Sequence, residues 1–427
     1  MKAFLHAAVC VMFVGSPMVS AGSVWDDILR PQMSPTTVDV RSAGMGGVAV
    51  AGITGSNAIF TNPAAVGATQ KSSIALGVEG RFGAIKDEYS KAQFDSYKSS
   101  YKPYLQLTHI SAALPIGIKD SPLGFAIGVG YHDQYTASRT FYKKSVLTGT
   151  TAETYEKYRG SMNLISPAVA LSIKNKFGIG LAVNQTLPGA FGKVSEVDKN
   201  NGTELPADEY SGSAFYLTVG IRALLIKNKL SLGGAFYSPA QWTFKKGENE
   251  EGDFTAPRMF ALGAQFQVTK QILAALEFQT RLFATMLAAT VSGDKLNNGV
   301  AIRLGGEYNL DPLLVRLGLN LENVPRTDMT QTAEVSTNES PKLAFGANAG
   351  IGIPLKPLTI QAALGWSRFG YEVTDESAGT STTYAYSENH FKLDLGITLD
   401  LPGAKIGRGE TKVDEGAEVP QPLDIGK

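Results

Sequence analysis

The feature that most constrains this chain is a double alternation along most of its 427 residues. Fourteen short stretches alternate large apolar residues with small or polar ones. In 123–131, Leu-Gly-Phe-Ala-Ile-Gly-Val-Gly-Tyr, every odd position is large and every even position is Gly or Ala. Successive side chains of a strand point to opposite faces, so each stretch predicts a β-strand with one apolar face. The stretches are 74–78, 104–114, 123–131, 162–173, 177–183, 215–221, 230–236, 260–268, 272–278, 300–308, 313–321, 343–353, 358–366 and 391–401.

Charged residues indicate which face of these strands meets lipid. Arg303 and Glu307 share the small face of 300–308, and Lys392 and Asp394 share that of the last stretch. An arginine on the lipid face near the midplane of a bilayer costs about 2–4 kcal/mol, so the large apolar side chains must face outward. Only 104–114 has two mixed faces and no assignable register. Outward aromatic residues near strand ends predict two interfacial girdles: Phe177, Tyr131, Phe236, Tyr308, Trp366 and Phe391.

The lengths of the connections separate a membrane barrel from a soluble sandwich. Short connections near 115–121, 174–176, 226–228, 268–271, 310–311 and 354–357 alternate with long ones near 82–103, 133–161, 188–210, 239–256, 284–297, 323–340 and 370–387. A soluble antiparallel sandwich also alternates along its strands, but its connections would not sort by length. Bacterial barrels have short periplasmic turns and long outer loops. The sequence therefore predicts an all-β protein, a 14-stranded antiparallel transmembrane β-barrel over 71–401 in the outer membrane of a Gram-negative bacterium.

The two ends of the chain differ from the barrel. Residues 1–21 have a charged start, a short apolar run and a small-residue end, which predicts a secretory signal peptide cleaved after Ala21. Cys10 lies inside it, so the mature chain would have no cysteine for disulfides or thiolate metal sites. Residues 402–427 lack periodicity and predict a flexible periplasmic tail. The net charge is zero and there is no basic cluster, so no nucleic-acid partner is expected.

Residues 22–70 precede the first strand and predict a plug, or hatch, inside the barrel. Fourteen strands enclose a lumen wider than small side chains can fill. The run 42–52, Ser-Ala-Gly-Met-Gly-Gly-Val-Ala-Val-Ala-Gly, suits a segment that turns tightly and fills the lumen. A loose dinucleotide fingerprint at 44–49 is rejected because no βαβ unit surrounds it. The hatch motif comprises Gly44, Gly46, Gly47, Asn62, Pro63 and Ala64.

Four segments together resemble the FadL family of outer-membrane transporters for long-chain fatty acids, which includes TodX-type importers of aromatic hydrocarbons. They are 41–51 with Asn-Pro-Ala-Ala at 62–65, Leu-Gly-Gly-Ala-Phe-Tyr-Ser-Pro at 232–239, 303–310 with 314–325, and 390–399. The resemblance implies fourteen strands, an N-terminal hatch and a lateral opening in the wall. It also implies capture of ligand on outer loops, binding beside the hatch, and release by hatch movement. The related PorV-type barrels share the N-terminal signature but act on protein cargo.

The candidate ligand-binding residues fall into three groups. Aromatic rings beside lysines in the third and fourth outer loops could hold an amphipathic carboxylate, although loops packing on themselves would explain them too. Inward arginines could meet a ligand headgroup, but such residues more often pair with lumen carboxylates such as Glu277 and Glu307. Apolar plug residues, including Val50 and Ile59, could line a pocket or simply pack the plug. The candidates are Phe191, Trp242, Phe244, Lys245 and Lys246; Arg222, Arg303 and Arg316; and Met45, Val48 and Phe60.

The motifs argue against an enzyme. No Gly-x-Ser-x-Gly elbow is present, and no histidine pair has metal-ligand spacing, so neither a cofactor nor a metal is expected. Pro167, in the fourth stretch, predicts a local break in the strand ladder. The expected function is passive uptake of hydrophobic small molecules by a monomer, since no TonB-like box precedes the plug. Its partners would be that ligand, outer-membrane lipid and the barrel assembly machinery. The alternative is a PorV-like barrel in protein secretion, or an envelope scaffold.

Overall fold

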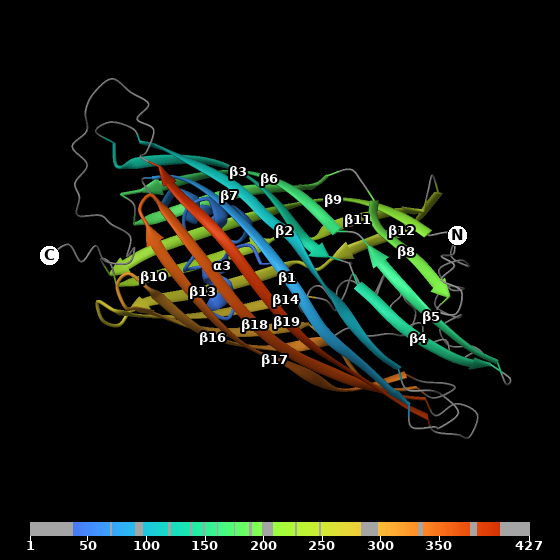
Figure 1. The fold of residues 1–427 in the computed structure, drawn as a ribbon. Helices are drawn as coiled ribbons and strands as arrows, with labels where there is room; N and C mark the ends of the chain where they lie inside the picture. Colours follow the sequence, from blue (N-terminus) through green and yellow to red (C-terminus); the bar gives the residue numbers. More distant parts are fainter. Residues whose placement is uncertain are drawn as a thin grey trace.

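The computed structural model of this protein shows a closed barrel of antiparallel strands with a short helical segment inside it (Figure 1). The predicted signal peptide, residues 22–36 and 69–70 of the predicted plug and the predicted tail lie outside the described residues. Among the described residues, no helix has the length and apolar character needed to cross a membrane. The structure describes residues 37–68, 71–89, 97–117, 121–136, 139–147, 150–159, 161–174, 176–187, 190–198, 208–226, 229–246, 249–282, 298–331, 336–375 and 382–401.

Fourteen of the described strands form the barrel wall, each paired antiparallel with the next, and β19 closes the ring on β1. Each contains or overlaps one of the fourteen stretches expected from the sequence, so the predicted strand count is confirmed. The wall strands are β1 (Ser72–Tyr89), β2 (Tyr97–Gly117), β3 (Leu123–Thr136), β6 (Ser161–Ile173), β7 (Phe177–Thr186), β9 (Asp208–Ile226), β10 (Leu230–Tyr237), β13 (Met259–Gln267), β14 (Ile272–Arg281), β15 (Gly299–Asn309), β16 (Leu314–Gln331), β17 (Ser336–Leu355), β18 (Leu358–Asp375) and β19 (Thr382–Leu401).

The long connections are not the loops that the sequence predicts. Several wall strands continue well into them, and five further strands lie beyond the wall at that end (Figure 1). Within these extensions β4 pairs with β5, β5 with β8, and β8 and β11 both pair with β9. The expectation of loops was therefore wrong for much of this end. The extra strands are β4 (Arg139–Leu147), β5 (Thr150–Arg159), β8 (Ala190–Asp198), β11 (Ala240–Lys246) and β12 (Asn249–Ala256).

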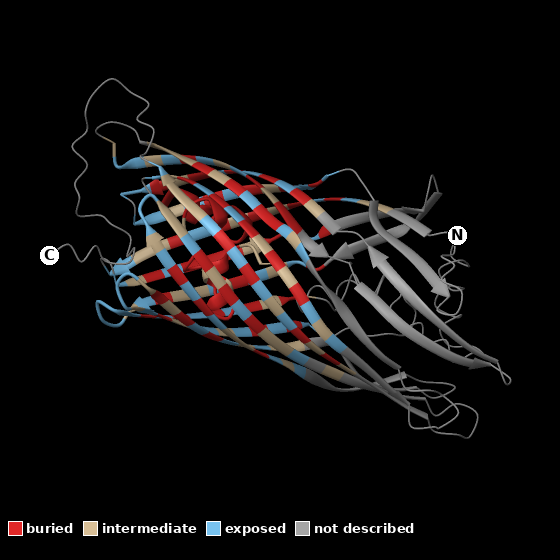
Figure 2. Ribbon diagram, viewed as in Figure 1, coloured by how far each residue is buried: buried red, intermediate tan, exposed pale blue. Residues whose placement is uncertain are grey.

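The two faces of the wall have the polarity that the charge pattern predicts. Leu317 is 65% exposed on the outside of β16, whereas its neighbour Arg316 is 1% exposed on the inside. Figure 2 shows this alternation repeated around the barrel. An exterior of leucine, isoleucine, valine and phenylalanine is the surface that a barrel presents to hydrocarbon. The predicted register is therefore confirmed.

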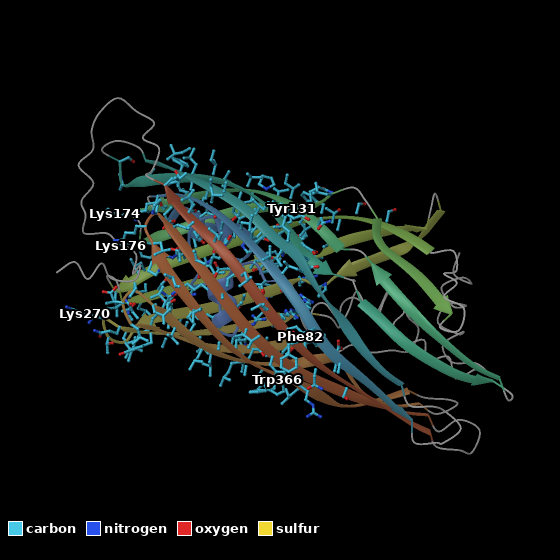
Figure 3. The ribbon with its side chains drawn as sticks, in the orientation of Figure 1. Phe82, Tyr131, Lys174, Lys176, Lys270 and Trp366 are labelled. Atoms are coloured by element: carbon cyan, nitrogen blue, oxygen red, sulfur yellow. The ribbon has the colours of Figure 1, made fainter. Side chains whose placement is uncertain are left out.

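The apolar outer surface of the wall forms a band around the barrel. Aromatic rings and lysines lie toward the two ends of this apolar band. Phe82 stacks on Phe391 with ring centroids 5.4 Å apart, and Phe345 meets Trp366 edge-on at 5.9 Å. Figure 3 places Lys174, Lys176 and Lys270 at the opposite end, where the short turns lie. Amphipathic rings and long cationic side chains suit the headgroup level of a bilayer. The band between them is the part of the wall that crosses the membrane.

Residues 37–68, here called the lumen segment, lie inside the barrel (Figure 1). The segment contains the helix α3 (Val40–Gly44) and the 3-10 helices η2 (Ser56–Phe60) and η3 (Pro63–Ala68). Gly46 has a φ of +74°, and a Cβ there would lie 2.8 Å from the backbone of Leu319. Only glycine combines this backbone conformation with so close an approach to the wall. The small-residue run thus lets the segment turn tightly against β15 and β16.

Candidate functional site: the lumen segment and the cavity beside it

The carboxylate of Asp39 links α3 to η2. Its Oδ1 accepts a 2.7 Å hydrogen bond from the backbone N–H of Ser42, which caps α3. Its Oδ2 accepts a 2.9 Å bond from the side-chain amide of Asn57. Ser111 of β2 in turn donates to Asn57 over 2.8 Å. One capping carboxylate therefore connects α3, η2 and the wall.

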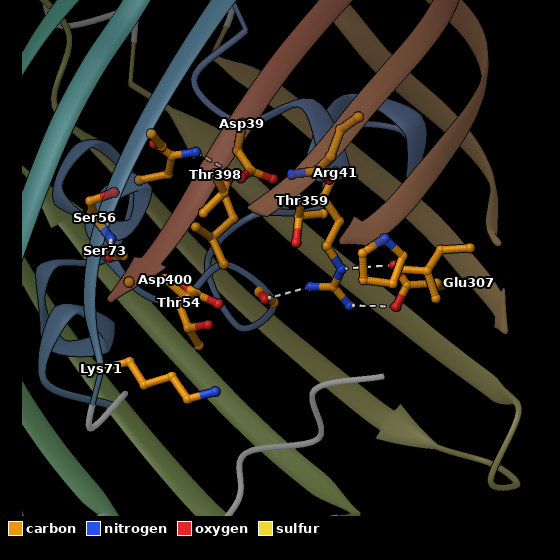
Figure 4. Close-up of a pocket in the computed structure, with 18 of the residues that line it drawn as sticks. Asp39, Arg41, Thr54, Ser56, Lys71, Ser73, Glu307, Thr359, Thr398 and Asp400 are labelled. Atoms are coloured by element: carbon orange, nitrogen blue, oxygen red, sulfur yellow. Dashed lines mark hydrogen bonds and ion pairs between the residues drawn. The ribbon is translucent and has the colours of Figure 1, made fainter. Parts of the chain in front are cut away.

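Arg41 attaches α3 to β15, the wall strand next to β16. Its guanidinium binds both oxygens of Glu307 on β15, at 2.9 and 3.1 Å, and donates to the carbonyl of Gly52 over 2.8 Å (Figure 4). Arg316 donates to the same carboxylate over 2.7 Å. Glu307 is thus shared between a residue of the segment and a residue of the wall.

Glu277 on β14 makes a second attachment to the backbone of the segment. Its Oε2 accepts the N–H groups of Ala49 and Val50 at 2.7 and 2.8 Å. Its Oε1 accepts from Arg303 over 2.7 Å, and Arg303 also donates to Gln279 over 2.9 Å. Arg303 and Arg316 therefore have carboxylate partners, as the alternative reading of the sequence expected.

The Asn-Pro-Ala part of the hatch motif fastens the end of the segment to β7, β9 and β10. Asn62 donates to the carbonyls of Val50 and Ile221 over 2.8 and 2.9 Å. Tyr237 of β10 donates to the carbonyl of Thr61 over 2.7 Å. A Cβ at Gly180 of β7 would lie only 2.3 Å from the carbonyl carbon of Pro63. Backbone meets backbone here, which explains small residues on both sides.

The apolar candidates of the lumen segment are packed rather than open to a cavity. Met45 and Val48 are each 2% exposed and cluster with Leu273 and Ala275 of the wall. Phe60 packs against His132, with ring centroids 4.9 Å apart. In this conformation these residues fill the bore. They could meet a ligand only if the segment moved.

A cavity of about 930 Å³ lies beside the segment at the short-turn end of the barrel (Figure 4). Five cationic and four acidic side chains line it: Arg41, Lys71, Arg222, Arg316 and Lys356, with Asp39, Glu307, Asp311 and Asp400. Apolar residues such as Ile53, Leu314 and Leu358 complete the wall. The cavity is thus both charged and apolar. Arg222, alone among the three predicted lumen arginines, has no carboxylate partner among the described residues.

The predicted capture residues lie in the extensions, where the structure describes the backbone only. Phe191 is in β8, and Trp242, Phe244, Lys245 and Lys246 are in β11, so none is in a loop. Ser211 of β9 pairs with Ala190 on one side and with Lys245 on the other. The backbone therefore brings Phe191 and the two lysines onto strands that flank β9. The structure does not describe the side chains of these residues.

Sequence reasoning did not single out Arg41 or Asp39 as site residues. Arg41 stands in the run that carries the family resemblance, but its role depends on Glu307, which is distant along the chain. Its only local signal was a charge beside a run of small residues. No group of three or more His, Cys, Asp or Glu in the described part of the chain could hold a metal ion. The polar groups of the site instead bind the segment to the wall.

Comparison with known proteins identifies the fold. No protein-family model and no curated protein matches this chain by sequence. The P. putida toluene transporter TodX superposes with a TM-score of 0.58 at 14% identity, over 86% of this chain and 99% of TodX. A Pseudomonas aeruginosa FadL homologue gives 0.56 at 13% identity, over 86% and 98%. With its closed ring of fourteen strands, this chain has the same fold as the toluene transporter TodX and the FadL homologue.

Proposed function

We propose that this protein is a passive outer-membrane channel for hydrophobic small molecules, in which the lumen segment is a movable hatch. The fold supports this proposal, because structures of the same fold include a toluene transporter and a channel for monoaromatic hydrocarbons. The apolar exterior supports a location in the Gram-negative outer membrane. In this proposal the barrel assembly machinery inserts the protein there, and it works as a monomer.

The observation that carries the proposal is how the lumen segment is attached. It contains only short helices and is fixed to the wall by side-chain hydrogen bonds and ion pairs rather than by strand pairing. Each such bond contributes a net free energy of about 1 kcal/mol, or about 1.5–3 kcal/mol where a carboxylate accepts it, because it replaces a hydrogen bond to water. The segment can therefore shift in the bore while every wall strand keeps its partners.

Two of the three groups of candidate residues have a role in this proposal. Phe191, Trp242 and Phe244, with Lys245 and Lys246, capture the ligand at the outer end. Movement of the segment exposes Met45, Val48 and Phe60, which then contact the apolar part of the ligand. Ladder pairing between β6 and β7 is interrupted at Ser166 and Pro167, which confirms the predicted break. This interruption is the candidate position for a lateral opening.

A disulfide lock tests the hatch. An ideal Cβ at Gly396 of β19 would lie 3.4 Å from the Cβ of Val40, close to the roughly 3.5–4.5 Å found in disulfides. The double variant Val40→Cys/Gly396→Cys should therefore lose uptake of radiolabelled toluene or palmitate by intact cells when oxidised. Treatment with dithiothreitol should restore uptake.

A second lock is the matched control. A Cβ at Gly67 would lie 3.8 Å from the Cβ of Ser172, and Gly67 is already held near the wall by its closeness in the chain to β1. Oxidised Gly67→Cys/Ser172→Cys should keep wild-type uptake. Equal uptake by both oxidised variants would reject hatch movement. Unchanged uptake in cells lacking the protein, with other envelope proteins co-purifying with it, would favour the protein-partner function instead.

A further inference from the structure

Arg222 on β9 is a buried arginine without a partner. It is 6% exposed and lines the cavity at the short-turn end. Its Nε atom has no hydrogen-bond partner, and no ion pair to it exists among the described residues. Arg41, Arg303 and Arg316, by contrast, each bind a carboxylate. An arginine cannot lose its proton to escape burial, so a guanidinium without a carboxylate partner makes this position favourable for an anion.

A second unpaired polar group lies close by on the same face of the wall. Gln265 of β13 is 7% exposed, and its Oε1 has no hydrogen-bond partner. Ser231 of β10 lies between the two strands: it pairs with Gln265, and Gly233, two residues on, pairs with Arg222. All three side chains line the same cavity. Because native proteins rarely leave buried polar atoms unpaired, two such groups at one cavity indicate a ligand.

The composition of the cavity indicates what kind of ligand fits. Its five cationic side chains exceed its four carboxylates by one charge. Arg41 and Arg316 are paired with Glu307, and Lys71 and Lys356 also have partners. Arg222 is thus the cation of this cavity that has no partner among the described residues. Apolar residues, among them Ile53, Leu314 and Leu358, form much of the remaining surface, so an amphipathic monoanion matches both properties.

We propose that Arg222, with Ser231 and Gln265, binds the carboxylate of an amphipathic acid at the short-turn end of the bore. The guanidinium fork matches the two oxygens of a carboxylate, and the apolar surface accepts the tail. This inference rests on the proposed function, because it places the site where a ligand arrives after passing the lumen segment. The site shares its cavity with the ion pair between Arg41 and Glu307, and Ser231 also donates to the carbonyl of Ala51 in the lumen segment over 3.4 Å.

Binding measurements on the full-length protein in a nonionic detergent test the site. Sodium decanoate is compared with 1-decanol, sodium acetate and sodium phosphate by isothermal titration calorimetry. The wild type should bind decanoate more tightly than decanol. Arg222→Gln should weaken decanoate binding about tenfold, as expected for a lost hydrogen bond to a charged group, and should leave decanol binding unchanged. Arg222→Lys should retain part of the preference, and Thr359→Val, on another wall of the cavity, should match the wild type.

Thermal unfolding gives an independent result. An unpaired buried charge opposes folding, so Arg222→Met should unfold at a higher temperature than the wild type without ligand. Decanoate should raise the unfolding temperature of the wild type but not that of the variant. A lower unfolding temperature for Arg222→Met without ligand would show that Arg222 has a structural partner, and would overturn the proposal.

The remaining outcomes separate the two proposals. If acetate or phosphate binds as tightly as decanoate, the site holds a free anion and the inference is overturned. If decanol and decanoate bind equally and both are taken up by cells, the inference fails while the proposed function stands. If neither binds and neither is taken up, the proposed function fails together with the inference.

Discussion

At the scale of single residues, the charges of the bore are largely determined by the alternation of the strands, but their partners are not. The sequence places Arg303 and Arg316 on the inner face because the outer face would cost several kcal/mol, roughly 2–4 near the midplane. It does not say that Glu277 also accepts two backbone N–H groups of the lumen segment. That role depends on how a segment without strand periodicity folds inside the barrel. Strand periodicity predicts a facing direction, not a tertiary contact.

Replacing Glu277 with glutamine should destabilise the protein strongly. The glutamine oxygen can accept from Ala49 and Val50, but its NH₂ group then faces the guanidinium of Arg303, donor against donor. Removing one partner of a buried ion pair costs about 3–5 kcal/mol, so the urea midpoint of unfolding in lipid vesicles should fall clearly. Hydrogen exchange at Ala49 and Val50 should also speed up.

Gln279 provides the matched control for Glu277. Its Oε1 accepts from both Arg281 and Arg303, so Gln279→Glu adds a negative charge between two cations. This variant should be at least as stable as the wild type. If both substitutions destabilise equally, loss of the ion pair is not the cause.

At the scale of the elements, β2 is the strand whose register the sequence could not assign, and its ladder with β1 is irregular. Leu107 pairs with Val78 and His109 with Gly77, so Thr108 is an extra residue on β2. This bulge puts Thr108 and His109 both in buried positions and interrupts the alternation of 104–114. The extensions were missed for a related reason, since β4, β5 and β12 are mostly polar and lack alternation. A pattern of period two finds regular, half-apolar strands and misses the others.

Replacement by alanine should have different effects at two consecutive glycines of β15. A Cβ at Gly305 would lie 2.6 Å from the carbonyl oxygen of Met45, whereas at Gly306 the nearest atom would be 3.7 Å away. Gly305→Ala should therefore displace the lumen segment at a cost of about 1–3 kcal/mol. Faster hydrogen exchange over residues 45–48 and faster nitrocefin entry into cells should follow. Gly306→Ala should behave as the wild type, and equal behaviour of both variants would contradict this packing.

At the scale of the whole molecule, sequence alone gave the strand number, the register and the sorting of connections, because a closed membrane barrel demands all three together. It could not give the cavity at the short-turn end. That cavity collects residues from the lumen segment, from turns such as 311–312 and from strands on several sides. Only closure of the ring brings these residues together.

Two leucines with nearly equal exposure test where the membrane lies. Leu304 is 51% exposed in the middle of β15, and Leu310 is 52% exposed in a short turn. Leu304→Arg should lower the free energy of unfolding in lipid bilayers by about 2–4 kcal/mol, while Leu310→Arg should lower it by no more than about 1 kcal/mol. Reversible urea titration in vesicles measures both. Similar losses would mean that the apolar band does not extend as the barrel geometry indicates.

The pairing of β1 with β19 has a consequence for how the molecule is made. Tyr89 pairs with Tyr384 and Ser72 with Leu401, so the seam waits for the last strand to be synthesised and delivered. Residues 37–68 touch strands on both sides of the bore. They are therefore enclosed in the bore when β19 pairs with β1. Closure of the barrel and enclosure of the lumen segment are therefore one step of assembly.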